Sequence, residues 1–156
     1  MEIGILLSIY VNQLEVGEHK MYEYKCKVVR IVDGDTVDVD IDLGFGVWMH
    51  KERIRMYGID APESRTRDLE EKKYGLASKQ YITDMLDDDG GIILKTHKDS
   101  EGKYGRILGE LWRTTTYADK SINEYMIEKH HAVRYMGQSK EDIVEGHLKN
   151  RTMLNL

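Results

Sequence analysis

A short stretch of strict alternation places the strongest constraint on what this chain can fold into. Residues 36–43 place apolar and acidic side chains in turn, in the order Val37, Asp38, Val39, Asp40, Ile41 and Asp42. A period of two is typical of a β-strand with one face in the core and the other in solvent. The pattern predicts a half-buried antiparallel strand whose three aspartates lie on the solvated face.

The rest of the chain supplies four more strands and about three helices. Strands are expected over residues 21–32, 47–59, 92–96 and 107–112, the first with a slip in phase that indicates a bulge. Apolar residues spaced by three and four predict helices over residues 74–86, 121–130 and 140–148. Residues 65–73 and 99–103 are rich in charged and polar residues and are expected to form loops. Five short strands with a helix after the third favour an α+β fold, a five-stranded Greek-key barrel of the OB type.

Composition narrows the class of protein. The 156 residues are 40% hydrophobic, which suits one folded domain and excludes a wholly disordered chain. No apolar run approaches the roughly 18 residues that cross a bilayer, so no membrane partner is expected. The single cysteine, Cys26, excludes an internal disulfide and a multi-cysteine metal site. A net charge of −5 means that any attraction to a nucleic acid must be local.

Residues 1–20 read as an extension, with one domain over residues 21–156. The apolar run at 3–11 has the character of a signal-peptide core, but Glu2 stands where a positive charge is expected and no small-residue cleavage site follows. We therefore expect a cytoplasmic protein rather than a secreted one. A second hypothesis treats Met21 as the true start, because residues 16–21 could be encoded by a ribosome-binding stretch, a spacer and a start codon.

Three carboxylates stand out from the solvated aspartates. Asp35 shares the parity of Val37 and so leans toward the core at a strand end, where a charge is costly without a partner. Asp60 and Glu63 flank Pro62, the only proline, which stiffens the turn that carries them. Oxygen ligands without histidine or thiol suit calcium or magnesium.

Two other sequence features bear on a metal or phosphate site. An EF-hand counted from Asp38 fails, because Leu43 stands at its glycine position and Met49 at its glutamate position. Arg106 opens a predicted strand after Lys103 and Tyr104, where its planar fork could bind a phosphate. A surface salt bridge for the arginine and partial core packing for the tyrosine are the structural alternatives.

Taken in order, these segments resemble the staphylococcal nuclease (thermonuclease) family. The segments that match are Val-Asp-Gly-Asp-Thr-Val at 32–37, Arg-Met-Tyr-Gly-Ile-Asp-Ala-Pro-Glu at 55–63, Lys-Tyr-Gly at 73–75, Lys-Tyr-Gly-Arg at 103–106, Asn-Glu at 123–124 and Ala-Val-Arg-Tyr at 132–135. The resemblance covers roughly residues 24–136. It implies an OB-type barrel and a metal-dependent phosphodiesterase that acts on DNA and RNA with little sequence preference and leaves a 3′-phosphate.

The resemblance also implies a role for each matched residue. Calcium is the implied cofactor, with magnesium and manganese as alternatives. The implied metal ligands are Asp35, Asp60 and the backbone carbonyl of Ala61. The implied catalytic residues are Glu63 as general base and Arg55 and Arg106 on the scissile phosphate. The implied substrate-binding residues are Lys103, Tyr104 and Tyr135.

Three features depart from the family pattern. Val133 stands where a second pocket tyrosine is expected, which implies weaker base stacking. The segment at residues 137–143 is longer than is usual in the family. The net charge of this chain is negative, whereas well-known members are basic.

Two other functions are compatible with parts of this pattern. One is an OB-fold module that binds nucleic acid without cutting it, which degenerate family domains do after losing acidic ligands or arginines. The other is a structural calcium-binding domain, which would have no use for Arg55 and Arg106. All five implied site side chains are present, so we favour the enzyme, acting as a monomer.

Overall fold

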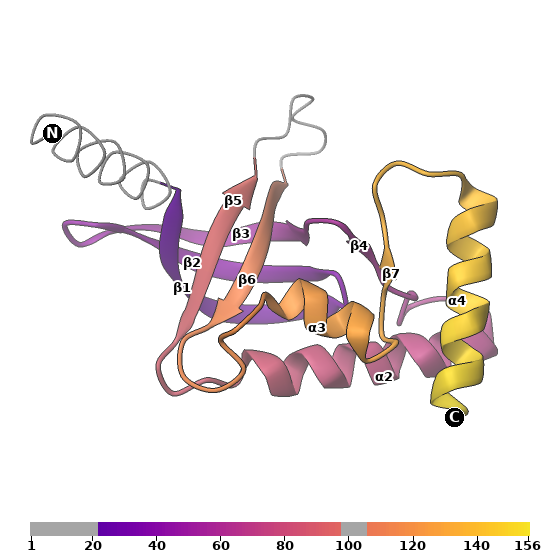
Figure 1. Ribbon diagram of the computed structural model, residues 1–156. Coiled ribbons are helices and arrows are strands. Elements are labelled where there is room, and N and C mark those ends of the chain that lie inside the picture. The colour runs from indigo at the N-terminus through magenta and orange to yellow at the C-terminus, as the bar shows by residue number, and fades with distance from the viewer. Residues whose placement is uncertain (1–21, 98–105) are drawn as a thin grey trace, which may run out of the picture.

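The computed structural model describes residues 22–97 and 106–156. Five strands close into a barrel in the order β1-β2-β3-β6-β5, and β4 and β7 form a separate two-stranded sheet (Figure 1). The strands are β1 (Glu23–Asp33), β2 (Thr36–Gly44), β3 (Val47–Met56), β4 (Ile59–Asp60), β5 (Ile92–His97), β6 (Ile107–Arg113) and β7 (Val133–Arg134). The helices are α2 (Leu69–Leu86), α3 (Ile122–Glu128) and α4 (Lys140–Leu154). The expected OB-type barrel with three helices is confirmed.

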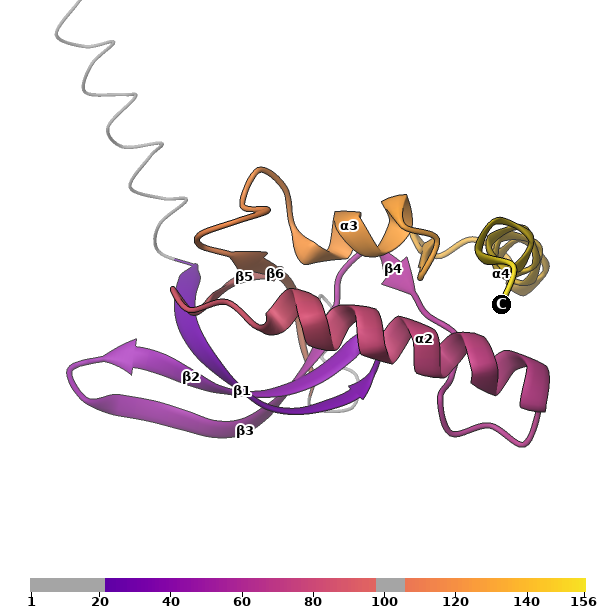
Figure 2. The ribbon, with the colours of Figure 1, turned by 90° about the horizontal axis from the view of Figure 1, so that it is seen from below.

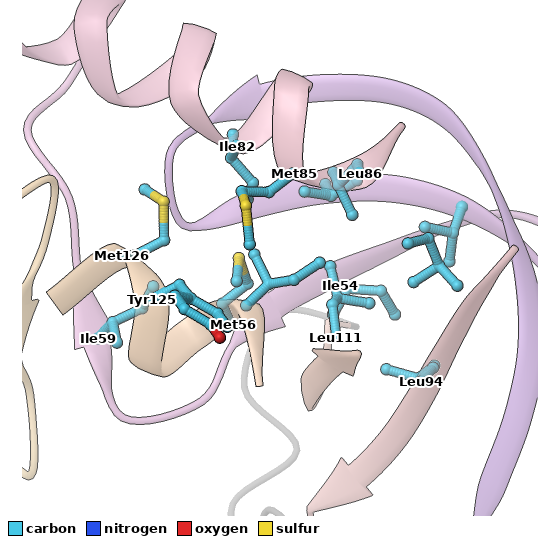
Figure 3. Packing of buried hydrophobic residues seen from close by; sticks show 14 of the residues in the cluster. Ile54, Met56, Ile59, Ile82, Met85, Leu86, Leu94, Leu111, Tyr125 and Met126 are labelled. Atoms are coloured by element: carbon cyan, nitrogen blue, oxygen red, sulfur yellow. The ribbon is translucent and has the colours of Figure 1, made fainter. Parts of the chain in front are cut away.

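The barrel interior is filled by the apolar face that alternation predicts. Val37, Val39 and Ile54 are completely buried. They pack with residues of α2 and α3, including Ile82 and Met126, in one continuous core (Figure 3). The bulge expected in the first strand is also present, as a shift of register against β2 between Val28 and Arg30.

The solvated face predicted for the aspartates of β2 is wrong at Asp38. Its side chain lies on the face opposite the core but is only 12% exposed, because two arginines cover it. Arg53 Nε lies 2.8 Å from Asp38 Oδ1, and Arg30 lies 3.2 Å from Oδ2. Alternation predicted which face Asp38 lies on, but not that neighbouring strands would lay cations over it.

The single strand predicted over residues 47–59 is two strands. β3 ends at Met56, and Gly58 then takes a positive φ of 75°, a conformation that glycine adopts without strain. The chain leaves the barrel at this turn, and Ile59 and Asp60 pair with Arg134 and Val133 of β7. This break moves Asp60 out of the barrel wall and toward α4.

The loop predicted over residues 65–73 is wrong in its second half, because α2 begins at Leu69. Asp68 caps the helix, and its carboxylate accepts hydrogen bonds from the backbone N–H groups of Glu70 and Glu71. Acidic residues in the first turn also favour a helix N-terminus. The part of α2 that precedes residue 74 contains only exposed or half-buried residues, so the spacing of apolar residues could not predict it as helix.

The last helix is longer than the expected 140–148 and reaches Leu154. It stands at the opposite end of the molecule from the β2–β3 hairpin (Figures 1 and 2). None of its residues is buried, so α4 is held by a few specific contacts at the β4–β7 end of the fold. Among the described residues, no helix has the length and apolar character needed to cross a membrane.

Removing residues 1–20 is expected to leave a folded domain. The continuous core described above is drawn from residues between Cys26 and Ala132, all downstream of the cut. Thermal melting of the full chain and of a chain that starts at Met21 should therefore both be cooperative. Loss of cooperative melting in the shorter chain would show that the extension belongs to the fold.

Candidate active site

Asp35 lies at the tight turn between β1 and β2, where Asp33 pairs with Thr36. Asp35 is only 8% exposed, and this burial raises the pKa of its carboxyl group. Three donors act in the other direction and favour the charged form. Arg55 Nη1 lies 3.0 Å from Oδ2, the Ala61 amide N lies 2.7 Å from Oδ2, and the Thr36 hydroxyl donates to Oδ1 at 2.8 Å. The buried carboxylate predicted at this strand end is present, and these three donors are its partners.

Arg55 joins two carboxylates that are 25 positions apart in the sequence. It lies opposite Thr36 in the β2–β3 pairing, which brings its guanidinium to Asp35. Its Nη2 also lies 3.4 Å from Asp60 Oδ1. Two acidic groups therefore share one arginine, in a position where a further cation would find an excess of negative charge.

Glu63 is exposed but sits on a loop that is fastened on both sides. On one side the Ala61 amide is bound to Asp35, as described above. On the other side, the Ser64 amide donates to Asp33 Oδ1 at 3.1 Å, and the Ser64 hydroxyl donates to the same oxygen. The loop is thus tied to the turn that carries Asp35, and it presents the exposed side chain of Glu63 to solvent three residues after Asp60.

Gly75 of α2 allows this loop to lie against the helix. A Cβ at residue 75 would stand 2.2 Å from the carbonyl oxygen of Glu63 and 2.7 Å from the amide N of Ser64. Both atoms belong to the backbone and cannot rotate away. The Lys-Tyr-Gly segment at 73–75 therefore has a packing reason for its glycine, which is the close approach of backbone to backbone.

Gly75→Ala is accordingly expected to displace the loop, lowering the free energy of unfolding by about 1–3 kcal/mol and impairing any activity that uses Glu63. Chemical denaturation and a nuclease assay would measure the two effects. Lys72→Ala, an exposed position on the same helix, is the matched control and should change neither. A Gly75→Ala protein with unchanged stability and activity would contradict the close packing described here.

A cleft of about 620 Å³ collects most of the predicted site residues. Its walls include Arg55, Asp60, Ala61, Glu63, Arg106 and Tyr135. A neighbouring hollow of about 320 Å³ shares Arg55 and Tyr135 and adds Tyr57 and Leu108. The predicted residues Lys103 and Tyr104 lie outside the described part of the chain. The structure thus brings together every predicted site residue that it describes, with buried Asp35 behind the cleft wall.

The donor set is compatible with a hard divalent cation. Asp35 and Asp60 supply two carboxylates that both contact Arg55, and Ala61 offers a backbone carbonyl between Asp60 and Glu63 in the sequence. Within residues 22–97 and 106–156, no group of three or more histidine, cysteine, aspartate or glutamate side chains forms a ready metal site. A site with two carboxylates suits a calcium or magnesium ion that completes its coordination with water. It suits less well an ion that protein ligands enclose on all sides.

Sequence reasoning did not find His147, which lies in the same cleft. Its Nε2 is 2.8 Å from Asp60 Oδ2, across 87 positions of sequence. The apolar spacing of α4 predicted a helix and did not mark this position. Only the docking of α4 against β7 brings this imidazole to Asp60, so no local sequence pattern could have revealed the contact.

Comparisons with known proteins identify the family to which the chain is similar. Residues 53–151 match the family described as staphylococcal nuclease homologue. The chain is 32% identical to protein ParB of Escherichia coli over 127 residues, which covers 78% of this chain and 63% of that protein. It is 31% identical to a thermonuclease of Staphylococcus intermedius over 85 residues, covering 54% of this chain and 46% of the relative. It is also 25% identical to endonuclease YhcR of Bacillus subtilis, of which it covers 9%. The chain thus spans less than two thirds of each of these relatives.

Proposed function

The chain belongs to the staphylococcal nuclease family, and on that premise we propose that it is a nuclease that hydrolyses phosphodiester bonds of DNA, RNA or both. We propose further that the reaction depends on a divalent cation, with calcium ahead of magnesium and manganese. The observation that carries the proposal is the sharing of Arg55 between Asp35 and Asp60 at the wall of a cleft. Such a cluster places an anion-binding fork beside oxygen ligands for a cation.

The reacting phosphate would be bound by the arginines. A phosphodiester resists attack because its negative charge repels nucleophiles. Arg55 and Arg106 both line the cleft, and their planar forks suit the oxygens of a phosphate. Donors of this kind lower the barrier when they fit the transition state better than the ground state. The residue pair therefore serves both to hold the phosphate and to offset the charge that develops on it.

Water would be activated by Glu63. Its exposed carboxylate stands on the fastened loop at the cleft and can accept a proton from an attacking water. The water oxygen bonds to phosphorus, one phosphorus–oxygen bond breaks, and the leaving oxygen takes a proton from solvent. Asp35, Asp60 and the carbonyl of Ala61 would hold the cation, which when bound withdraws charge from a non-bridging oxygen of the phosphate.

The experiment that tests the proposal separates cutting from binding. Purified protein would be mixed with plasmid DNA and, separately, with a labelled RNA, in calcium, magnesium and manganese in turn, and both cleavage and retention of the nucleic acid would be measured. We expect cleavage of at least one substrate by the wild-type protein and none by Asp60→Asn. Retention of nucleic acid without cleavage under calcium, magnesium and manganese would contradict the enzyme and identify a binding module instead.

A further inference from the structure

α4 packs closely against β7 beside the candidate active site. Gly146 lies against Val133 of β7, where a Cβ at residue 146 would stand 2.7 Å from Val133 Cγ1 and 3.0 Å from Cγ2. Glycine inside a helix costs up to about 1 kcal/mol relative to alanine, so its presence in an exposed helix needs a reason. The reason here is that only glycine lets α4 come this near to the β4–β7 sheet.

This contact places the next residue, His147, against Asp60. Val133 pairs with Asp60 in the two-stranded sheet, and His147 follows Gly146 directly. The imidazole Nε2 reaches Asp60 Oδ2 at 2.8 Å, and the histidine side chain is 15% exposed. A carboxylate oxygen can only accept a hydrogen bond, so Nε2 is the donor.

Asp60 is consequently held at both of its oxygens. Oδ1 faces Arg55 at 3.4 Å, while Oδ2 faces His147. The aspartate sits on a strand of two residues, and its side chain is 33% exposed, so the backbone alone does little to fix its rotamer. The two donors come from different elements, β3 and α4, and together set the plane of the carboxylate.

We propose that His147 is a positioning residue that orients Asp60 for the divalent cation, and that α4 is thereby part of the active site. The inference rests on the proposed function, because it assigns His147 to the cation site proposed there. Partners that hydrogen-bond to a ligating carboxylate typically change metal affinity or activity 10- to 100-fold when removed. A carboxylate held in one orientation binds a cation without first losing rotational freedom.

Calcium affinity, measured directly by calorimetric titration of the full chain, tests this inference without reliance on turnover. His147→Ala removes the donor and is expected to weaken calcium binding about 10- to 100-fold. His147→Gln keeps an N–H at a similar reach and should remain within a few-fold of wild type. Asn150→Ala is the matched control, because Asn150 Nδ2 anchors α4 to the carbonyl oxygen of Ala132 at 3.0 Å and does not touch Asp60. It removes one anchor of α4 but keeps the His147 donor, so it should weaken calcium binding less than His147→Ala does.

Gly146→Ala provides a second perturbation that leaves every polar group in place. It should push α4 away from Val133 and weaken calcium binding in the same direction as His147→Ala. Equal affinities for wild type and His147→Ala would overturn the inference. So would equal losses in His147→Ala and Asn150→Ala, which would mark a role in docking α4, or a His147→Gln protein as weak as His147→Ala.

The failure of this inference can be told apart from that of the proposed function. A wild-type protein that cuts nucleic acid but binds no divalent cation would refute the cation site and with it the role of His147. A wild-type protein that binds calcium and cuts, with His147→Ala unchanged in both, would refute the role of His147 alone.

Discussion

Replacing Arg55 with alanine is expected to lower the rate of phosphodiester cleavage by roughly 10² to 10³ at saturating substrate, with a smaller change in substrate affinity. The guanidinium is the group proposed to meet the charge that develops on the phosphate. Lysine should restore little of the rate, because it lacks the planar fork. Single-turnover cleavage and equilibrium binding of the same oligonucleotide would separate the two effects.

The same substitution also bears on stability. Arg55 is the only side-chain cation within ion-pair distance of Asp35 among the described residues. Removing one partner of a buried pair costs about 3–5 kcal/mol, so Arg55→Ala should melt well below wild type and must be assayed where it is still folded. The matched control is Arg53→Ala, on the same strand and in a two-point contact with Asp38 away from the cleft. It should keep the wild-type rate. Equal losses of rate and affinity in Arg55→Ala would mark Arg55 as a plain binding residue.

Replacing Glu63 with glutamine is the second substitution expected to change turnover strongly. It should reduce turnover by about 10² to 10⁴ while leaving nucleotide binding and the melting temperature close to wild type. The amide cannot accept the proton of the attacking water, and the exposed side chain carries no part of the core. Single-turnover rate constants and equilibrium binding constants for the same oligonucleotide would separate the loss of rate from any loss of affinity.

Glu70→Gln is the matched control for that substitution. Glu70 is an exposed carboxylate in the first turn of α2, where it pairs with Lys73, and it is absent from the cleft walls. It should cleave at the wild-type rate. A Glu63→Gln protein with a near wild-type rate would remove Glu63 from the mechanism.

The part of the site that sequence could predict is the part built by local pattern. The parity of Asp35 with Val37 predicted a carboxylate on the core side of a strand end, and the structure places it there. Pro62 marked the turn between Asp60 and Glu63. Each of these inferences needs only the period of a strand or the stiffness of a proline.

The parts that sequence missed depend on tertiary placement. Gly58 is the local sign of the break between β3 and β4, but the residues on both sides of it are equally strand-like, so the pattern predicts one strand. The covering of Asp38 by Arg30 and Arg53 arises from pairing with two neighbouring strands. His147 reaches Asp60 only because Gly146 lets α4 approach Val133. A contact across the fold of this kind leaves no periodic trace in the chain.

The most direct test of a cation-dependent nuclease at the Asp35–Arg55–Asp60 cluster is a chelation cycle on a single preparation. Cleavage of a plasmid would be followed in calcium, then after exhaustive chelation, and again after calcium is restored, with Asp35→Asn carried in parallel. We expect cleavage to stop on chelation and to return with calcium in the wild-type protein, and to be absent throughout in Asp35→Asn. Cleavage that continues undiminished after exhaustive chelation would contradict the cation-dependent site.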